Sequence, residues 1–296
     1  MKRSMLFLVG ILLTAPTAAW AEGWQKSADL GLNFNQASYN DAWTGGESGS
    51  IAWTFVGNLS AEKALSPRYN WRNTLKLSYG QTHTQREDDA KERHWLSPEK
   101  SSDRIFFESL LRMTLGLAVD PYASFTFESQ FYDASVPEVV HYIDPMTLSE
   151  ALGVGRTLVK NEQAELLSRL GFSLRHHIWK DVLSIDPEET ETNTTTDGGL
   201  EWVTDYAQTF SGEKMKYVSK LRVFKALFNS KVDDFKGLEN EDYWKTPDVA
   251  WENTLSASVS KYIQVSLFAE LLYDKEVDLR GRFREVLGLG VAYKLF

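Results

Sequence analysis

The chain has no cysteine among its 296 residues. This absence excludes disulfides, thiolate metal sites and a cysteine nucleophile. Long hydrophobic runs are also missing beyond the N-terminus, where no stretch approaches the roughly 18 apolar residues that a membrane-spanning helix needs. Positive charge is outnumbered, with 32 Lys and Arg against 41 Asp and Glu, for a formal net charge of -9. This balance argues against nucleic-acid partners.

Aromatic residues, by contrast, are abundant. They make up 13% of the chain and include 10 Trp. Trp and Tyr favour the boundary between membrane and water, where the ring meets an apolar environment and the polar tip a wet one. The composition therefore points to a membrane protein that does not cross the bilayer with helices.

The first residues have the pattern of a secretory signal peptide. Lys2 and Arg3 give the charged start, Leu6–Leu13 the apolar core, and Ala19-Trp20-Ala21 the small-x-small cleavage site. The apolar core is too short for a membrane anchor. We expect a signal peptide over residues 1–21 and one mature domain over residues 22–296.

The mature region reads as about twelve segments in which apolar and polar residues alternate. Such alternation is typical of β-strands, because successive side chains point to opposite faces. The sixth segment is the weakest, and Met146–Leu152 just before it also fits a helical turn. The segments are Trp24–Tyr39, Ser50–Glu62, Tyr69–Thr82, Arg104–Leu115, Tyr122–Tyr132, Leu152–Lys160, one around Leu166–Arg175, Gly199–Phe210, Met215–Phe228, Val249–Lys261, Tyr262–Asp274 and Phe283–Phe296.

The connections between these segments alternate in length. Short ones lie at Ala64–Pro67, Val119–Pro121, Asn161–Gln163, Ser211–Glu213 and Ser260–Lys261. Long polar ones lie at Asn40–Gly49, His83–Asp103, Asp133–Glu150, Lys180–Gly198, Asn229–Asp248 and Lys275–Arg280. This is typical of a transmembrane barrel, with tight turns on the periplasmic side and longer loops outside. A soluble β-sandwich also alternates, but its strands are usually about five or six residues long.

We therefore predict an all-β fold: a transmembrane antiparallel up-and-down β-barrel of about twelve strands in an outer membrane. Its apolar face would contact lipid and its polar face the lumen. Trp43 lies in a loop with paired glycines and fits an anchor or lid better than a ligand platform. The aromatic residues expected at the membrane interfaces are Trp24, Trp43, Trp53, Trp71, Tyr79, Trp251, Tyr273 and Tyr293.

The polar face carries charges of both signs. One interpretation is a pore whose opposed charges set weak ion selectivity. The other is a ladder of ion pairs that satisfies the interior and leaves little open channel. The candidate lumen and selectivity residues are Arg72, Lys76, Glu108, Arg112, Arg169, Arg175, Lys220, Arg222, Glu252 and Glu270. The same face carries Asp29, Glu62, Glu128, Glu165, Glu201, Asp205, Arg284 and Lys294.

No catalytic motif stands out. A hydrolase needs a nucleophile beside a histidine that a third group orients. The nearest arrangement, His141-Tyr142-Ile143-Asp144, lacks the nucleophile, and His176-His177 fits a solvated pair at a loop edge. The acidic clusters Asp88-Asp89, Asp233-Asp234 and Glu239–Asp242 lack calcium-loop spacing. We predict no enzyme activity, no cofactor and no bound metal, and a mobile polar segment at Glu188–Thr196.

Four stretches resemble a known family. They are Gly23–Lys26 with Leu30–Ser38, Trp43–Ser48, Trp71–Leu75 with Ser78–Gly80, and Phe283–Tyr293. Together they are similar to the uncharacterised outer-membrane barrels called domain of unknown function 3078. The resemblance implies an outer-membrane barrel. It implies no activity and no catalytic residue.

These observations give an exported integral outer-membrane protein, monomeric by default. The preferred function is a passive pore or narrow channel for small solutes. The alternatives are a closed structural or partner-binding barrel and, less favoured, an outer-membrane hydrolase. Expected partners are outer-membrane lipid, lipopolysaccharide and the barrel-assembly machinery. That machinery would read Tyr293, Leu295 and Phe296, although Phe296 is out of phase with the other two.

Overall fold

The structure is a computed structural model that describes residues 23–39, 48–88, 92–136, 139–186, 188–212 and 214–294. The predicted signal peptide, Trp43, Leu295 and Phe296 lie outside these residues, as does the side chain of Tyr293. Among the described residues, no helix combines the length and the hydropathy needed to cross a membrane.

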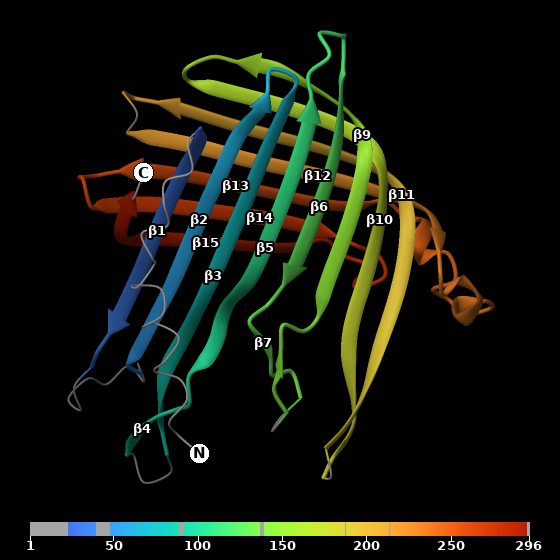
Figure 1. Cartoon of the computed structure of the whole chain (residues 1–296). Coiled ribbons are helices and arrows are strands. Elements are labelled where there is room, and N and C mark those ends of the chain that lie inside the picture. Colours follow the sequence, from blue (N-terminus) through green and yellow to red (C-terminus); the bar gives the residue numbers. More distant parts are fainter. Residues whose placement is uncertain are drawn as a thin grey trace.

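Strands dominate the chain and close into a barrel (Figure 1). The long strands are β1 (Trp24–Ala37), β2 (Ser50–Ser66), β3 (Tyr69–Glu87), β5 (Glu99–Met113), β6 (Asp120–Ser129), β9 (Met146–Lys160), β10 (Ala164–Ile185), β11 (Glu188–Phe210), β12 (Met215–Asn229), β13 (Asp248–Ser258), β14 (Ile263–Tyr273) and β15 (Arg282–Lys294). The short elements are β4 (Arg93–Trp95), β7 (Tyr132–Asp133), β8 (His141–Tyr142) and the 3-10 turns η1 (Val232–Phe235) and η2 (Tyr243–Lys245).

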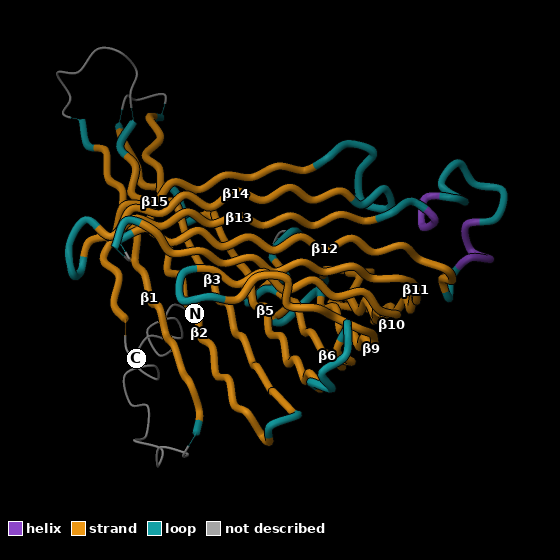
Figure 2. The backbone as a smooth tube through the Cα atoms, turned by 90° about the horizontal axis from the view of Figure 1, so that it is seen from above, coloured by secondary structure: helices purple, strands orange, loops and turns teal. Residues whose placement is uncertain are grey.

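Each long strand pairs antiparallel with its neighbour in the sequence, and β1 pairs with β15 to close the ring. Leu30 lies opposite Tyr293 in this closing pair, and Leu30 also lies opposite Gly57 of β2. The predicted twelve-stranded up-and-down barrel is confirmed. In Figure 1 the strands of the near wall run steeply, and β13, β14 and β15 cross behind them, as tilted strands of a barrel do. Figure 2 shows the strands of both walls from above.

Alternation along the strands puts the large apolar side chains outside. Leu287 is 72% exposed, Leu289 62% and Phe34 58%, although all three lie within regular strands. Exposing so many apolar side chains to water would be unfavourable, because burying one side chain of this size away from water lowers the free energy by roughly 1.5–3 kcal/mol. The outer surface is therefore suited to contact with lipid, and the polar residues between these positions point inward.

Two parts of the predicted segmentation are wrong. The residues Met146–Leu152 belong to β9 and form no helical turn, because they pair along their whole length with β6 and β10. The predicted loop Lys180–Gly198 is instead a continuation of the β10–β11 hairpin, in which Ile185 pairs with Glu188. Thr190 and Thr192 in this polar stretch are β-branched, and β-branched residues suit an extended ladder. The segment predicted to be mobile is thus paired strand.

The aromatic residues gather near both ends of the strands. At the end with short turns, the rings of Trp24 and Trp71 lie 5.4 Å apart. At the end with long loops, Tyr79 lies 5.7 Å from Trp53 and 5.7 Å from Phe131. Trp251 and Tyr273 also lie toward the loop end, near the start of β13 and at the end of β14. The arrangement fits the predicted interface positions of these residues.

Candidate functional site

Charged side chains from opposite walls meet directly inside the barrel. Arg104 on β5 donates to Glu252 on β13 at 2.6 Å. These strands face each other, since β6, β9, β10, β11 and β12 separate them on one side and β3, β2, β1, β15 and β14 on the other. Glu252 also accepts from Lys76 at 2.8 Å, and Arg104 lies 2.9 Å from Glu128 and 3.6 Å from Glu270. These five residues form the loop-side cluster.

A second, central cluster lies nearer the middle of the strands. Arg169 of β10 donates to Glu108 of β5 at 2.9 Å and to Asp205 of β11 at 2.8 Å. Lys220 of β12 donates to Glu108 at 2.8 Å and lies 3.3 Å from Asp205. Arg169 is 2% exposed and Lys220 7%. Two cations therefore alternate with two carboxylates, which neutralises charges that burial would otherwise make costly.

Phe106 fills the space between these two clusters. It is 1% exposed, and it sits on β5 between Arg104 and Glu108. The charged groups of Lys76, Arg104, Lys220 and Arg222 lie 5.2–5.8 Å from its ring centroid. Three of these cations, Lys76, Arg104 and Lys220, already belong to the clusters above. The negative face of an aromatic ring attracts cations, most strongly when water is excluded.

Toward the short turns the lumen is filled by a small apolar cluster and then by a third ion-pair group. Arg72 of β3 donates to Glu62 at 2.7 Å and reaches Glu165 of β10 at 3.0 Å. Arg112 donates to Thr157 of β9 at 3.0 Å. The apolar cluster consists of the buried residues Leu110, Tyr122, Ala151 and Leu167. Side chains thus occupy the interior at successive heights, and no loop of the described residues is needed to close it.

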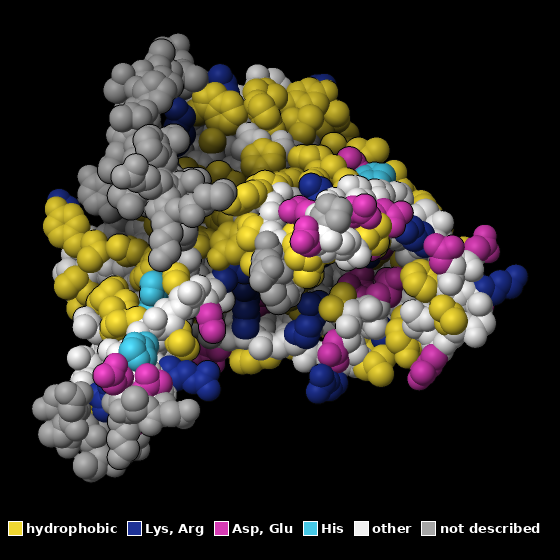
Figure 3. All heavy atoms as spheres, turned by 90° about the horizontal axis from the view of Figure 1, so that it is seen from below, with side chains coloured by type: hydrophobic (Ala, Val, Ile, Leu, Met, Phe, Trp, Pro, Cys, Tyr) yellow, Lys and Arg dark blue, Asp and Glu magenta, His cyan; other side chains and the backbone are white. Residues whose placement is uncertain are grey.

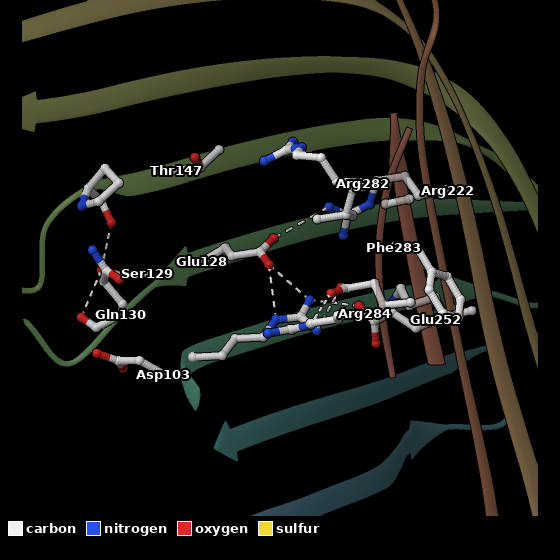
Figure 4. Close-up of a pocket in the computed structure, with 16 residues that line it drawn as sticks. Asp103, Glu128, Ser129, Gln130, Thr147, Arg222, Glu252, Arg282, Phe283 and Arg284 are labelled. Atoms are coloured by element: carbon white, nitrogen blue, oxygen red, sulfur yellow. Dashed lines mark hydrogen bonds and ion pairs between the residues drawn. The ribbon is translucent and has the colours of Figure 1, made fainter. Parts of the chain in front are cut away.

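Above the loop-side cluster the lumen opens into a cavity of about 420 Å³. It is bordered by the loop-side ends of β5, β6, β9, β12, β13, β14 and β15. Figure 3, seen from the side where β4 and β7 lie, shows basic and acidic side chains gathered around a hollow. Figure 4 shows Arg222, Arg282 and Arg284 reaching into this cavity, with Glu128 among them. We call this cavity the vestibule.

A further charged group lies beside the loops. Arg175 donates to Asp197 and to Asp248 at 2.6 and 2.8 Å and stacks 3.5 Å from the ring of Phe224. Glu276 lies in the connection between β14 and β15. Its side chain remains exposed to solvent, but partial desolvation by the surrounding chain and the carboxylates of Asp274 and Asp248 raise the pKa of Glu276 to about 7. This acidic group therefore titrates near neutral pH.

The structure places the predicted lumen residues inside the barrel and brings most of them together. Lys76, Glu252 and Glu270 lie in the loop-side cluster, Glu108, Arg169 and Lys220 in the central cluster, and Arg72 in the turn-side group. Arg222 is more loosely held, with Glu201 at 3.8 Å and Glu128 at 4.0 Å. Arg175 and Arg112 do not join these clusters. Their role in ion selectivity stays a prediction.

The sequence interpretation missed Arg104 and the apolar residues of the lumen. Arg104, Phe106 and Leu110 share the parity of Glu108 and Arg112 along β5, so strict alternation already assigns them to the inner face. Residue type hid Phe106 and Leu110, because large apolar side chains fit lipid as well as a packed lumen. Arg104 stood at the start of its predicted segment.

Two histidines of the described chain each lie beside a threonine hydroxyl and a carboxylate. These neighbours are Thr196 and Glu150 for His176, and Thr147 and Asp197 for His177. His176 and His177 lie in β10 and not at a loop edge, and they contact Thr196 and Asp197 respectively. His141 lies 3.6 Å from Asp144, but no hydroxyl of a described residue is hydrogen-bonded to it. Asp88, Glu92 and His94 have ligand atoms within 4.8 Å of one another on an exposed hairpin, where such groups are common without a metal.

Comparison with known proteins gives one family match. A family model described as "Protein of unknown function (DUF3078)" matches residues 34–134. No curated protein matches the chain.

A comparison with solved structures finds several outer-membrane proteins of low similarity. The translocator domain of autotransporter NalP from Neisseria meningitidis is 11% identical, with 96% of this chain and 91% of that chain covered and a TM-score of 0.37. The COG4313 outer membrane channel from Pseudomonas putida F1 is 10% identical, with 94% and 98% covered and a TM-score of 0.38. The transport unit of autotransporter AIDA-I from Escherichia coli is 8% identical, with 96% and 94% covered and a TM-score of 0.34. TM-scores and identities this low transfer no function.

The family match covers the end of β1 and the whole of β2, β3, β5 and β6. It agrees with the resemblance carried by Trp71–Leu75 and Ser78–Gly80. Over residues 34–134 this chain matches the family of unknown function DUF3078, and the predicted resemblance to these uncharacterised barrels is confirmed.

Proposed function

We propose that this protein is an outer-membrane β-barrel whose lumen is closed by its own side chains and whose working surface is the vestibule at the loop end. The carrying observation is the hydrogen bond of 2.6 Å between Arg104 and Glu252, which joins opposite walls. A passive pore needs a continuous aqueous path. Here the loop-side cluster, Phe106, the central cluster and the apolar cluster lie in that path.

The membrane location is supported by the outer surface. Leucine and phenylalanine side chains are widely exposed on the strands, and aromatic rings lie near both strand ends. Charges concentrate on the inside, as a transmembrane barrel requires. We propose that lipid and lipopolysaccharide contact the apolar face and that the barrel has no enzymatic activity.

Single-channel recording in a planar bilayer tests the closure. The refolded wild-type protein should carry no steady current. The double variant Arg104→Ala/Glu252→Ala removes one cation and one anion from opposite walls and leaves the net charge unchanged. On its own it should stay silent, because Phe106, the central cluster and the apolar cluster still fill the path below this bridge. Adding Phe106→Ala, Glu108→Ala/Arg169→Ala and Leu110→Ala, which shortens the side chains at those levels, should give a steady current.

The matched control is Asp278→Ala/Arg280→Ala, which removes an exposed ion pair of 3.1 Å in the β14–β15 connection. It should stay silent. Circular dichroism and protease resistance in the same bilayer-forming lipid identify folded, inserted protein. Steady current through the folded wild type would overturn the proposal and favour the passive pore predicted from the sequence.

A further inference from the structure

The vestibule contains guanidinium donors that are not used, whereas two of its carboxylates, Asp103 and Glu252, are fully engaged. Asp103 accepts from the backbone N–H groups of Phe131 and Tyr132 and lies 3.0 Å from Lys100. Glu252 uses both oxygens, one for Arg104 and one for Lys76. Asp103 and Glu252 are thus already neutralised; Glu128 also borders the cavity and pairs with Arg104 at 2.9 Å.

The arginines on the β12 and β15 side are different. Arg222 reaches its two carboxylates only at 3.8 and 4.0 Å, and its buried Nε has no hydrogen-bond partner among the described residues. The ion pairs found in the described chain do not include Arg282, although it lines the cavity. Arg284 pairs through Nε with Glu270 at 2.6 Å, and its side chain is 44% exposed.

The buried Nε of Arg222 lacks an acceptor, which is costlier for a guanidinium nitrogen than for a neutral one. Arg282 and Arg284 are exposed, so their donors are open to a ligand that enters through water. A guanidinium offers a planar fork that matches the oxygens of a carboxylate or phosphate. In Figure 4 the side chains of Arg222 and Arg282 both point into the cavity on the side of Glu128. An oxyanion placed there would accept from the free donors of both arginines.

We infer that the vestibule is a binding site for a small soluble oxyanion, a carboxylate or phosphate compound, held by Arg222, Arg282 and Arg284. The inference rests on the proposed closed barrel, because closure below the site makes the cavity a blind pocket. A volume of about 420 Å³ suits a small molecule. The site lies on the inner side of the strands, so its ligand arrives through water from the loop end.

Isothermal titration calorimetry of the refolded protein in detergent tests the inference, with inorganic phosphate and citrate as probes. The wild type should bind at least one of them at low salt. Arg282→Gln and Arg222→Gln should each weaken binding about tenfold or more, since either change removes one fork. Neither variant breaks a short ion pair, so both should fold, and circular dichroism checks this.

Arg280→Gln is the matched control. It removes the same charge two residues before Arg282, but Arg280 pairs with Asp278 in the loop and does not line the vestibule. Its affinity should stay within about twofold of wild type. If all three variants lost the same amount of affinity, the binding would depend only on the positive charge near the loops, and the proposed site would be wrong.

No heat of binding for either probe in the wild type would also overturn it. A second arm uses dihexanoyl phosphatidic acid as the probe. If this lipid phosphate bound more tightly than inorganic phosphate, the proposal that the ligand is a small soluble compound would be wrong. This test is separate from the test of the closed barrel, because conductance is measured independently of binding. A protein that carries no current and binds no anion would support the closed barrel and contradict the anion site.

Discussion

Arg169 is the most informative residue to replace, because it lies at the centre of the buried charge network. Its guanidinium contacts Glu108 at 2.9 Å and Asp205 at 2.8 Å, and the residue is 2% exposed. With Lys220 the cluster contains two positive and two negative groups. Arg169→Met keeps a long side chain but leaves two buried carboxylates with one cation.

The expected loss follows from this imbalance. Breaking a buried ion pair by removing one partner costs about 3–5 kcal/mol, because a charge stays behind without compensation. Arg169→Met should therefore lower the free energy of unfolding by about that amount. Arg169→Met/Asp205→Asn restores neutrality and leaves the 2.8 Å pair of Lys220 and Glu108 intact. The double variant should recover about 1–3 kcal/mol of the loss.

Urea unfolding in lipid vesicles, followed by tryptophan fluorescence, measures both quantities. Arg280→Met provides the control, since its exposed loop position should change stability by no more than about 0.5 kcal/mol. The reasoning would be refuted if Arg169→Met stayed within about 1 kcal/mol of wild type. Simple additivity of Arg169→Met and Asp205→Asn would also refute it, because it would show that the two groups do not depend on each other.

Three further predictions concern the lipid face, the lumen and the loops. Leu267→Arg, on the outer face in the middle of β14, should cost about 2–4 kcal/mol in the same unfolding assay, whereas Leu267→Met should cost less than about 1.5 kcal/mol; equal stability of the two would contradict the assigned facing. Tyr122→Phe should be neutral or stabilising, because the buried hydroxyl has no hydrogen-bond partner among the described residues; a loss above about 1 kcal/mol would reveal one. The raised pKa of Glu276, about 7 against a reference value of 4.5, means that the unfolded chain loses this proton first, so the wild type should lose stability as pH rises from about 4.5 to 7. Glu276→Gln should remove that part of the pH dependence, and an unchanged pH profile would show that Asp274 and Asp248 do not raise the pKa of Glu276.

Most of the barrel could be predicted from the alternation of apolar and polar residues, because every second side chain of a strand faces lipid and is apolar. The exceptions have local causes. The polar run Glu188–Thr196 carries no apolar face, since the β10–β11 hairpin continues beyond the outer apolar band, and hydrophobic patterning cannot detect it. Met146–Leu152 has apolar and small residues on both faces, because its inward position Ala151 belongs to the apolar cluster of the lumen.

The candidate site shows a different limit. Alternation assigns Lys76, Glu108, Arg169 and Lys220 to the lumen, but it says nothing about which of them meet. Arg104 and Glu252 lie 148 residues apart in sequence. Their contact depends on the number of strands and on the tilt, which together place β5 opposite β13. Whether the lumen is open or closed is therefore decided by side-chain length across the ring, a property that no single segment encodes.

The same charges also fix the register of the barrel. A slip of one residue would move every inward side chain of a strand to the outside. On β5 this slip would expose Arg104, Glu108 and Arg112 to lipid, where one arginine near the midplane costs about 2–4 kcal/mol. It would simultaneously take Arg104 away from Glu252, and Glu108 away from Arg169 and Lys220. An apolar filling of the lumen would close the barrel equally well but would tolerate the slip, because both faces of β5 would then suit lipid. Closure by ion pairs thus specifies the fold and blocks the lumen with one set of residues, and variants that open the lumen by removing charge from β5 should also fold with a less uniform register.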